Sequence, residues 1–227
     1  METEWTIWYD RKSLNKQESD AYVEGLHPLG SFNTIEGFYA NYAYLMRPHD
    51  LPSDINIHLF RKGFKPMWEE FPDGGCWSMR LAQKSGEKAK VDGIWESIIL
   101  GLIGEQYEMP DIVGCVLSRR SQFDMISVWN MTSTSANTFR IGETTKALVR
   151  MRESKTFILT YKSFMEAMRD FSTYRNAKGY KFGNSNTMTP ALLCADSPGT
   201  PPLPPTTPEK KSKKKKSKSK LKKSLFT

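Results

Sequence analysis

Residues 112–130, with the sequence IVGCVLSRRSQFDMISVWN, carry a strong signal of β-structure. β-branched and aromatic residues are concentrated in Ile112–Arg119 and again in Met125–Asn130, and this composition favours β-strands. The same signal predicts four more strands, at Trp5–Arg11, Asn56–Phe60, Cys76–Leu81 and Thr156–Thr160. The chain is therefore expected to contain several short strands.

Helix signals lie between the predicted strands. Asn33 is followed three residues later by Glu36, the pattern of a capping box, which predicts a helix that continues to Tyr42. Three more helices are predicted, at Ile94–Leu102 with Asp92 as its cap and Gly104 at its end, at Thr144–Arg152, and from Ser163 with Glu166 completing a second capping box. Helices scattered among short strands and long loops indicate an α+β fold.

Charge and composition divide the chain into two parts. Of the 227 residues, 209–227 hold ten lysines against Glu209 alone, a net charge of +9, so the total of +8 leaves about −1 for residues 1–208. After residue 184 the sequence is polar, then proline-rich, then composed of lysine and serine. Such a segment buries too little apolar surface to offset chain entropy. We therefore expect one folded domain, residues 1–183, and a disordered tail, residues 184–227.

Several classes of protein are disfavoured. No apolar run reaches 18 residues, and the acidic amino terminus is unlike a secretory signal. Three widely spaced cysteines fit neither a disulfide scaffold nor a metal knuckle, and indicate a reducing compartment. Cys115 lies in an apolar run and is expected to be buried and inert. The three histidines have no acidic partner at metal-site spacing, so we expect no enzyme, metal or cofactor site.

Trp68 is the residue most indicative of a binding site. It lies in the segment Lys65-Pro-Met-Trp-Glu-Glu70, where Pro66 and the polar residues that follow favour a loop. A loop tryptophan beside a carboxylate is suited to guanine, because the indole stacks on the base and Glu69 accepts hydrogen bonds from N1 and N2 of its Watson–Crick edge. By contrast, Trp8, Trp77 and Trp95 are expected in the core.

The chain resembles the eukaryotic translation initiation factor 4E family, the messenger-RNA cap-binding proteins, and is most similar to the divergent branch typified by the 4E homologous protein. The resemblance covers residues 5–183 and leaves the tail outside. Its motifs keep the family's order: Trp5-x-x-Trp8, Phe32-Asn-Thr-Ile-Glu-Gly-Phe38, His58-Leu-Phe-x-x-Gly63, Lys65-Pro-Met-Trp-Glu69, Gly74-Gly-x-Trp77, Leu102-Ile-Gly-Glu105 and Ile126-Ser-Val-Trp129. It implies a curved antiparallel sheet backed by about three helices on its convex face, with a slot for the cap on the concave side.

The resemblance also implies the residues of the slot. The 7-methylguanine base would lie between two aromatic rings, which match Trp68 and Tyr22, while Glu69 matches the guanine-edge acceptor. Arg120 matches an arginine that binds the cap phosphates, and Trp129 matches the residue on the N7-methyl group. Two alternatives stay open, since Tyr22 could be an ordinary surface or strand residue and Trp129 a core residue.

One position departs from the family's phosphate clamp. Cys76 stands where the family has a basic residue before its tryptophan. Strand alternation places Cys76 on the face opposite to Trp77, and we expect it to face the phosphates. Arg119 should point to the other face from Arg120. Three basic residues near the carboxyl end of the domain are candidates to compensate for the missing charge: Arg175, Lys178 and Lys181.

Partner binding is implied on the convex side. Family members bind a helix carrying the motif Tyr-x-x-x-x-Leu-apolar, from a scaffold or a repressor protein. Ile35 and Leu100 match two apolar contacts, and Tyr39 replaces a tryptophan. Ser97 stands where initiation-competent members have glutamate, and Glu96 where they have leucine, and these exchanges weaken the expectation of scaffold binding.

The resemblance thus implies a monomer that recognises the 7-methylguanosine cap without catalysis, in translation initiation or its repression. We expect it in the cytoplasm, with a further nuclear pool through the lysine-rich tail. The alternative is a general RNA-binding protein that acts mainly through the basic tail, whose binding would ignore the cap and collapse with salt.

Overall fold

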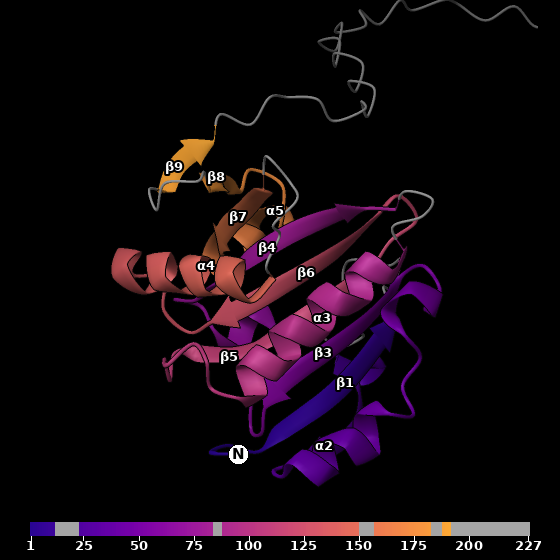
Figure 1. Cartoon of the computed structure of the whole chain (residues 1–227). Coiled ribbons are helices and arrows are strands. Elements are labelled where there is room, and N and C mark those ends of the chain that lie inside the picture. Colours follow the sequence, from indigo (N-terminus) through magenta and orange to yellow (C-terminus); the bar gives the residue numbers. More distant parts are fainter. Residues whose placement is uncertain (12–22, 84–87, 150–156, 183–187, 192–227) are drawn as a thin grey trace, which may run out of the picture. The chain divides into compact units, whose positions relative to one another are not determined.

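One antiparallel sheet forms the framework of the domain. The computed structural model describes residues 1–11, 23–83, 88–149, 157–182 and 188–191. Within them the strand order is β2-β1-β3-β5-β6-β4-β7-β8-β9, and every neighbouring pair is antiparallel (Figure 1). The strands are β1 Trp5–Arg11, β2 His27–Phe32, β3 Ile55–Arg61, β4 Gly75–Ala82, β5 Ile112–Arg119, β6 Phe123–Asn130, β7 Phe157–Ser163, β8 Lys178–Phe182 and β9 Met188–Ala191.

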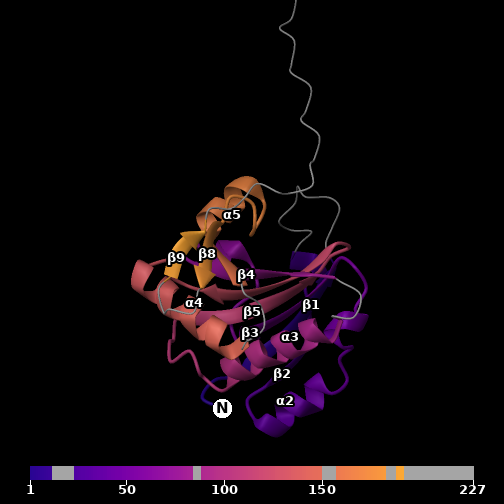
Figure 2. The same ribbon diagram turned by 45° about the horizontal axis from the view of Figure 1, so that its top comes forward.

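The helices lie on both sides of this curved sheet. They are α2 Ile35–Tyr42, α3 Lys88–Ile103, α4 Ser135–Val149 and α5 Phe164–Asp170, with two 3₁₀ turns, η1 Pro48–Asp50 and η2 Trp68–Glu70. Figure 2 shows α3 and α5 on opposite sides of the sheet. The face that carries α2, α3 and α4 is the convex face, and the face that carries η2 and α5 is the concave face. Among the described residues no helix has the length and apolar character of a membrane span.

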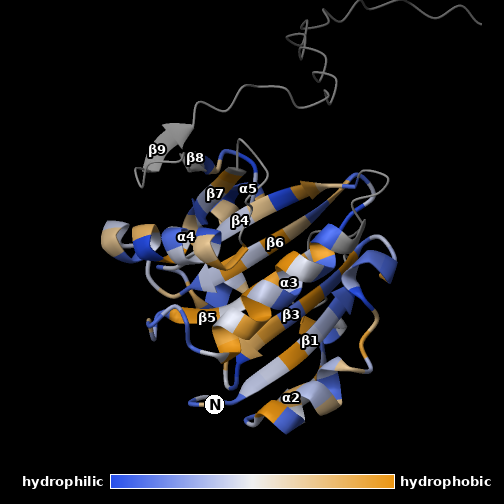
Figure 3. Cartoon of the chain, in the orientation of Figure 1, coloured by the Kyte–Doolittle hydropathy of each residue, from blue (hydrophilic) through white to orange (hydrophobic). Residues whose placement is uncertain are grey.

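Strand alternation gives each face its own core. On the convex face Leu59, Trp77 and Ile126 pack in one cluster with Ile98 and Leu102 of α3. The residues one position along the same strands form a second cluster on the concave face, which contains Phe60, Cys76, Val116, Trp129, Phe71 and Phe164. Figure 3 shows apolar residues along β5 and α3, which contact each other on the convex face. The expected α+β fold with a curved antiparallel sheet is confirmed.

The predicted strands are all present. β1 and β5 have the predicted bounds, and the other four differ by a few residues at one or both ends. Three strands were not predicted. β2 contains Pro28 and Gly30 and is mostly exposed, and an edge strand tolerates such residues because one side of it needs no hydrogen bonds. β8 and β9 form the other edge, and β9 lies within the segment that composition predicts as tail. The boundary at residue 183 stays a prediction.

Two predicted helix caps are wrong and one is confirmed. Thr34, not Asn33, caps α2, because its Oγ1 accepts a hydrogen bond from the Gly37 N–H at 3.0 Å. Asp92 lies inside α3, which begins at Lys88, and its carboxylate instead accepts from the His49 N–H at 3.0 Å. Ser163 does cap α5, since its Oγ accepts from the Glu166 N–H at 3.3 Å. The third helix, α4, begins nine residues before the predicted Thr144, at Ser135.

Candidate functional site

Trp68 and Glu69 lie side by side on η2, at the concave face. The turn is held from below by Phe71, which is 3% exposed and packs against Phe60, Phe164 and Trp129 with ring centroids 6.3–6.4 Å apart. The Phe71 N–H also donates to the Trp68 carbonyl at 3.0 Å. Trp68 is only half-buried, against the concave-face cluster. The indole therefore has one packed side and one accessible side, as a stacking residue requires.

Glu69 is exposed and free to accept hydrogen bonds. Within the described residues its carboxylate makes no hydrogen bond and no ion pair. It differs in this from Glu105, which pairs with Arg61 at 2.6 Å. An unpaired carboxylate fixed beside an accessible indole matches the donor edge of a purine base.

Trp129 is mainly a core residue in this structure. It is 5% exposed, and its ring packs against Phe164 with centroids 4.4 Å apart and against Phe60 at 5.3 Å. Its Nε1 has no hydrogen-bond partner within the described residues. The packing therefore supports the core alternative, and contact with a ligand would use only the small exposed part of the ring.

Arg120 follows β5 at the concave side and is partly buried. Burial lowers the pKa of Arg120, while the nearby groups of Asp54, Asp10 and Tyr174 oppose that change. Its Nη1 donates to the Arg119 carbonyl at 2.7 Å. Arg119 points to the opposite face as predicted, where it pairs with Asp124 and donates to the carbonyls of Leu51 and His49 at 3.3 and 3.2 Å.

The expectation for Cys76 is half right. It does face away from Trp77, but it is 0% exposed, so its thiol does not reach an open phosphate site. Burial raises the pKa of Cys76 to about 12, and the sulfur lies 3.6 Å from Ser78 Oγ. Apolar side chains of the concave-face cluster and the hydroxyl of Ser78 enclose this position.

Lys162 lies beside Cys76 and was not predicted as a site residue. Register pairs Cys76 of β4 with Lys162 of β7, so both side chains are on the concave face. The Lys162 ammonium is fully buried, pairs with Asp170 and donates to the Arg175 carbonyl. The positive charge that the family resemblance places on β4 is thus absent there, while a buried lysine occupies the neighbouring strand. Its sequence neighbours, Tyr161 and Ser163, give no signal of this.

A second buried polar group lies at the other end of the concave face. Asp10 Oδ2 is 2.7 Å from His58 Nε2, and Asn56 Nδ2 donates to Asp10 Oδ1 at 2.7 Å. All three residues are buried. His58 therefore has an acidic partner, which sequence spacing did not reveal because 48 residues separate the pair.

Two of the predicted site residues are not fully described. Tyr22 lies outside the described residues. Lys181 is in β8, but its side chain is also outside the description. Arg175 and Lys178 are exposed, and the Arg175 carbonyl is occupied by Lys162.

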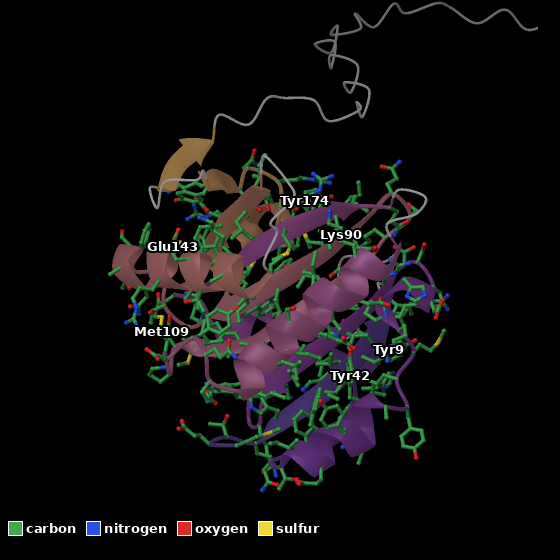
Figure 4. All side chains as sticks on the ribbon, in the orientation of Figure 1. Tyr9, Tyr42, Lys90, Met109, Glu143 and Tyr174 are labelled. Atoms are coloured by element: carbon green, nitrogen blue, oxygen red, sulfur yellow. The ribbon has the colours of Figure 1, made fainter. Side chains whose placement is uncertain are left out.

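The predicted partner-binding residues are exposed on the convex side. Ile35 is 62%, Tyr39 56% and Leu100 43% exposed, so all three side chains are accessible to a partner. Glu96 of α3 accepts from Arg47 at 2.5 Å and from the Tyr42 hydroxyl at 3.3 Å, and so links α3 to α2. Tyr42 is labelled in Figure 4. Ser97 donates to the Gly93 carbonyl of its own helix at 2.8 Å.

The fold is a curved antiparallel sheet with helices on its convex face. On its concave side it carries an accessible indole, an unpaired carboxylate and an arginine, which together define the class of the protein. The sequence matches the family model described as eukaryotic initiation factor 4E over residues 1–179. The eukaryotic translation initiation factor NCBP of Triticum aestivum is 33% identical over 181 residues, which are 75% of this chain and 72% of that protein.

Solved structures agree with the family match. Ascaris suum eIF4E-3 in complex with an m7G cap is 27% identical, with a TM-score of 0.64 over 72% of this chain and 89% of that one. Caenorhabditis elegans eIF4E-3 in complex with the 4E-binding protein Mextli and a cap analog is 25% identical, with a TM-score of 0.65 over 74% and 94%. The chain belongs to the eukaryotic initiation factor 4E family.

Proposed function

We propose that this protein binds the 7-methylguanosine 5′ cap of mRNA and takes part in translation initiation or its repression. The observation that carries the proposal is the exposed, unpaired Glu69 beside the half-buried Trp68 on a turn fixed by Phe71. This pair offers a stacking surface and an acceptor to one guanine. The cap complex of the Ascaris relative, which shares the fold, supports the same ligand class.

Each site residue has a role in this proposal. Trp68 and Tyr22 stack on the base, whose N7 methylation makes it cationic and adds a cation–π attraction of about 0.5–2 kcal/mol. Glu69 accepts from N1 and N2, and Arg120 pairs with the phosphates. Trp129 supports the slot from below and contacts the methyl group through its exposed part.

The binding is proposed to be non-enzymatic. Nucleophilic catalysis by cysteine needs an accessible thiolate, whereas burial raises the pKa of Cys76 to about 12 and that of Cys115 well above its usual value. The Asp10–His58 pair is buried, and Asn56 donates a further hydrogen bond to Asp10. These groups are suited to holding the two faces of the sheet together rather than to attacking a ligand.

Partners and place of action complete the proposal. The exposed set Ile35, Tyr39 and Leu100 would bind a helix with the Tyr-x-x-x-x-Leu-apolar motif, and the Mextli complex of the Caenorhabditis relative supports a 4E-binding protein as the source. Glu96 is already engaged by Arg47 and Tyr42, so a scaffold helix that needs this position would compete with them. We place the protein in the cytoplasm, acting as a monomer on capped mRNA.

Titration of the full chain with 7-methyl-GTP and with GTP, followed by tryptophan fluorescence, tests the proposal. We expect a clear preference for the methylated nucleotide, because only its base is cationic. Equal affinity for both nucleotides would contradict cap recognition. Binding to uncapped RNA alone, with a steep loss in salt, would favour a general RNA-binding protein instead.

A further inference from the structure

Asp54 lies opposite Arg120, at the end of the sheet where the cap phosphates are proposed to bind. β3 and β5 are antiparallel neighbours (Figure 1), and Asn56 of β3 pairs with Ser118 of β5. Asp54 comes two residues before Asn56, and Arg120 comes two residues after Ser118, so continued strand alternation places both side chains on the concave face. The Asp54 N–H donates to the Arg119 carbonyl at 3.0 Å, which fixes the two backbones beside each other.

Asp10 is a second carboxylate on the same face, one strand further along. It is 1% exposed, and it pairs in register with Asn56, whose Nδ2 donates to Asp10 Oδ1 at 2.7 Å. His58 Nε2 lies 2.7 Å from the other oxygen, Asp10 Oδ2. These two contacts fix the carboxylate in place, while no arginine or lysine within the described residues forms an ion pair with it.

Arg120 is partly buried and is influenced by both carboxylates. Burial lowers the pKa of Arg120, and Asp54 and Asp10 are the first of the nearby groups that oppose this change. Within the described residues Arg120 forms no ion pair with either carboxylate, and its Nη1 instead donates to the Arg119 carbonyl at 2.7 Å. Its remaining donors are therefore available to a phosphate, but two carboxylates oppose the charge behind them.

Other charged side chains at the concave face are already paired. Asp124 of β6 forms an ion pair with Arg119. Lys162 of β7 is fully buried and forms an ion pair with Asp170. Neither cation is thus available to offset the two carboxylates at the end of β5. Arg120 therefore has to serve both these carboxylates and any bound phosphate.

We propose that Asp54 and Asp10 are positioning residues that compete with the cap phosphates for Arg120, and so limit how much a triphosphate adds to binding. The inference rests on the proposed function, which assigns the phosphates to Arg120. A guanidinium that faces carboxylates loses part of that attraction when it turns to a phosphate, and the same carboxylates repel a polyanion. The chain thus depends on the methylated base for most of its affinity and discriminates little between caps of different phosphate charge.

Asp54→Asn tests the proposal because it removes a charge without straining the backbone. Asp54 has a φ of 65°, in the left-handed region, and asparagine tolerates this conformation as aspartate does. The variant should bind 7-methyl-GTP about threefold more tightly than wild type, as for a pair of partly exposed charges near the surface. Binding of the nucleoside 7-methylguanosine should be unchanged. A substitution that merely damaged the fold would weaken both ligands.

Two further variants test whether the effect acts through Arg120. In an Arg120→Ala background, Asp54→Asn should leave 7-methyl-GTP affinity nearly unchanged, because the group for which the carboxylate competes is gone. Asp10→Asn should tighten binding of 7-methyl-GTP alone, although it lowers stability because Asp10 is buried and hydrogen-bonded. A full gain that persists without Arg120 would overturn the proposal, since it would show general repulsion of the triphosphate. Weaker 7-methyl-GTP binding by a folded Asp10→Asn variant would exclude Asp10 from the competing pair.

Glu108→Gln is the matched control. Glu108 is an exposed acid with a φ of 51°, and it precedes β5 whereas Arg120 follows it, so the two lie at opposite ends of that strand. The control should not change binding of either ligand. Unchanged 7-methyl-GTP affinity in Asp54→Asn, or an equal gain for nucleoside and triphosphate, would contradict the proposal. A wild type that binds GTP as tightly as 7-methyl-GTP would instead refute the proposed function.

Discussion

The convex and concave faces of the sheet are built from alternate residues of the same strands, yet their buried residues differ in kind. On β4, Trp77 packs among apolar residues under α3 and α4, while Cys76 and Ser78 face the other way, and all three are 0% exposed. Ser78 Oγ lies 3.0 Å from Ser127 Oγ. Burial alone thus does not separate a core from the floor of a site. Hydrogen-bonded polar groups distinguish the two, because a polar group is costly to bury unless it has a hydrogen-bond partner.

The largest expected difference between the faces is in stability. Trp77→Ala should lower the free energy of unfolding by about 3–5 kcal/mol, because it leaves a large cavity and removes the hydrogen bond from Nε1 to the Thr138 carbonyl at 2.8 Å. Cys76→Ala, one residue away, should cost about 1 kcal/mol, since it deletes a single sulfur. Urea unfolding of both variants measures this. Similar losses would contradict the distinction drawn between the faces.

A second variant places a charge where the concave face is closed. Cys76→Arg should lower the free energy of unfolding by about 3 kcal/mol, because an arginine at a fully buried position overpacks it and puts a second cation beside Lys162. It should not tighten binding of 7-methyl-GTP. An increase of tenfold, with normal stability, would show that this position opens to the phosphates after all.

The site prediction concerns binding rather than folding. Glu69→Gln should weaken 7-methyl-GTP binding by about 1–3 kcal/mol, because an amide presents only one acceptor to the two donors of guanine. Glu70→Gln is the matched control, as Glu70 is an exposed neighbour on the same turn. Urea unfolding should be unchanged in both. Equal effects of the two substitutions on binding would remove Glu69 from the slot.

The smallest effect is a dependence on pH. A hydrogen bond from Lys162 lowers the pKa of Asp170 below its usual 3.8. A carboxyl with a lowered folded-state pKa stabilises the fold above the unfolded-state pKa, and this contribution is lost as pH falls through the folded-state value.

The difference in unfolding free energy between wild type and Asp170→Asn should therefore be constant near neutral pH. It should shrink below pH 3.8. Urea titrations between neutral and acid pH measure it, with Asp73→Asn as an exposed control. A difference that does not change with pH would show that the ion pair with Lys162 contributes nothing to stability.

Local signals explain which parts of the fold could be predicted. Trp5–Arg11 and Ile112–Arg119 have the predicted bounds because β-branched, aromatic and other apolar residues make up most of each segment. β2 was missed because Pro28 and Gly30 oppose strand structure locally, and only pairing with β1 stabilises it. Asn33 and Thr34 are both suitable caps, and the choice between them depends on how the chain leaves β2.

The site residues also divide into those that the local sequence predicts and those whose placement depends on tertiary contacts. Trp68 and Glu69 are neighbours in sequence, so their pairing could be predicted, and η2 places them together. The burial of Lys162 and of Asp10 could not be predicted, because it depends on partners that are distant in the sequence. Lys162 meets Asp170 only after β7 turns into α5, and Asp10 meets His58 only when β1 pairs with β3.

The buried thiol of Cys76 can report local opening of the domain. Burial raises the pKa of Cys76 to about 12 and that of Cys115 well above its usual value, so neither forms a reactive thiolate near neutral pH. Both lie on central strands, β4 and β5. With Cys194 replaced by serine, an alkylating reagent would modify the chain only when these strands separate. The labelling rate in native buffer would then measure how often the centre of the sheet opens, without any denaturant.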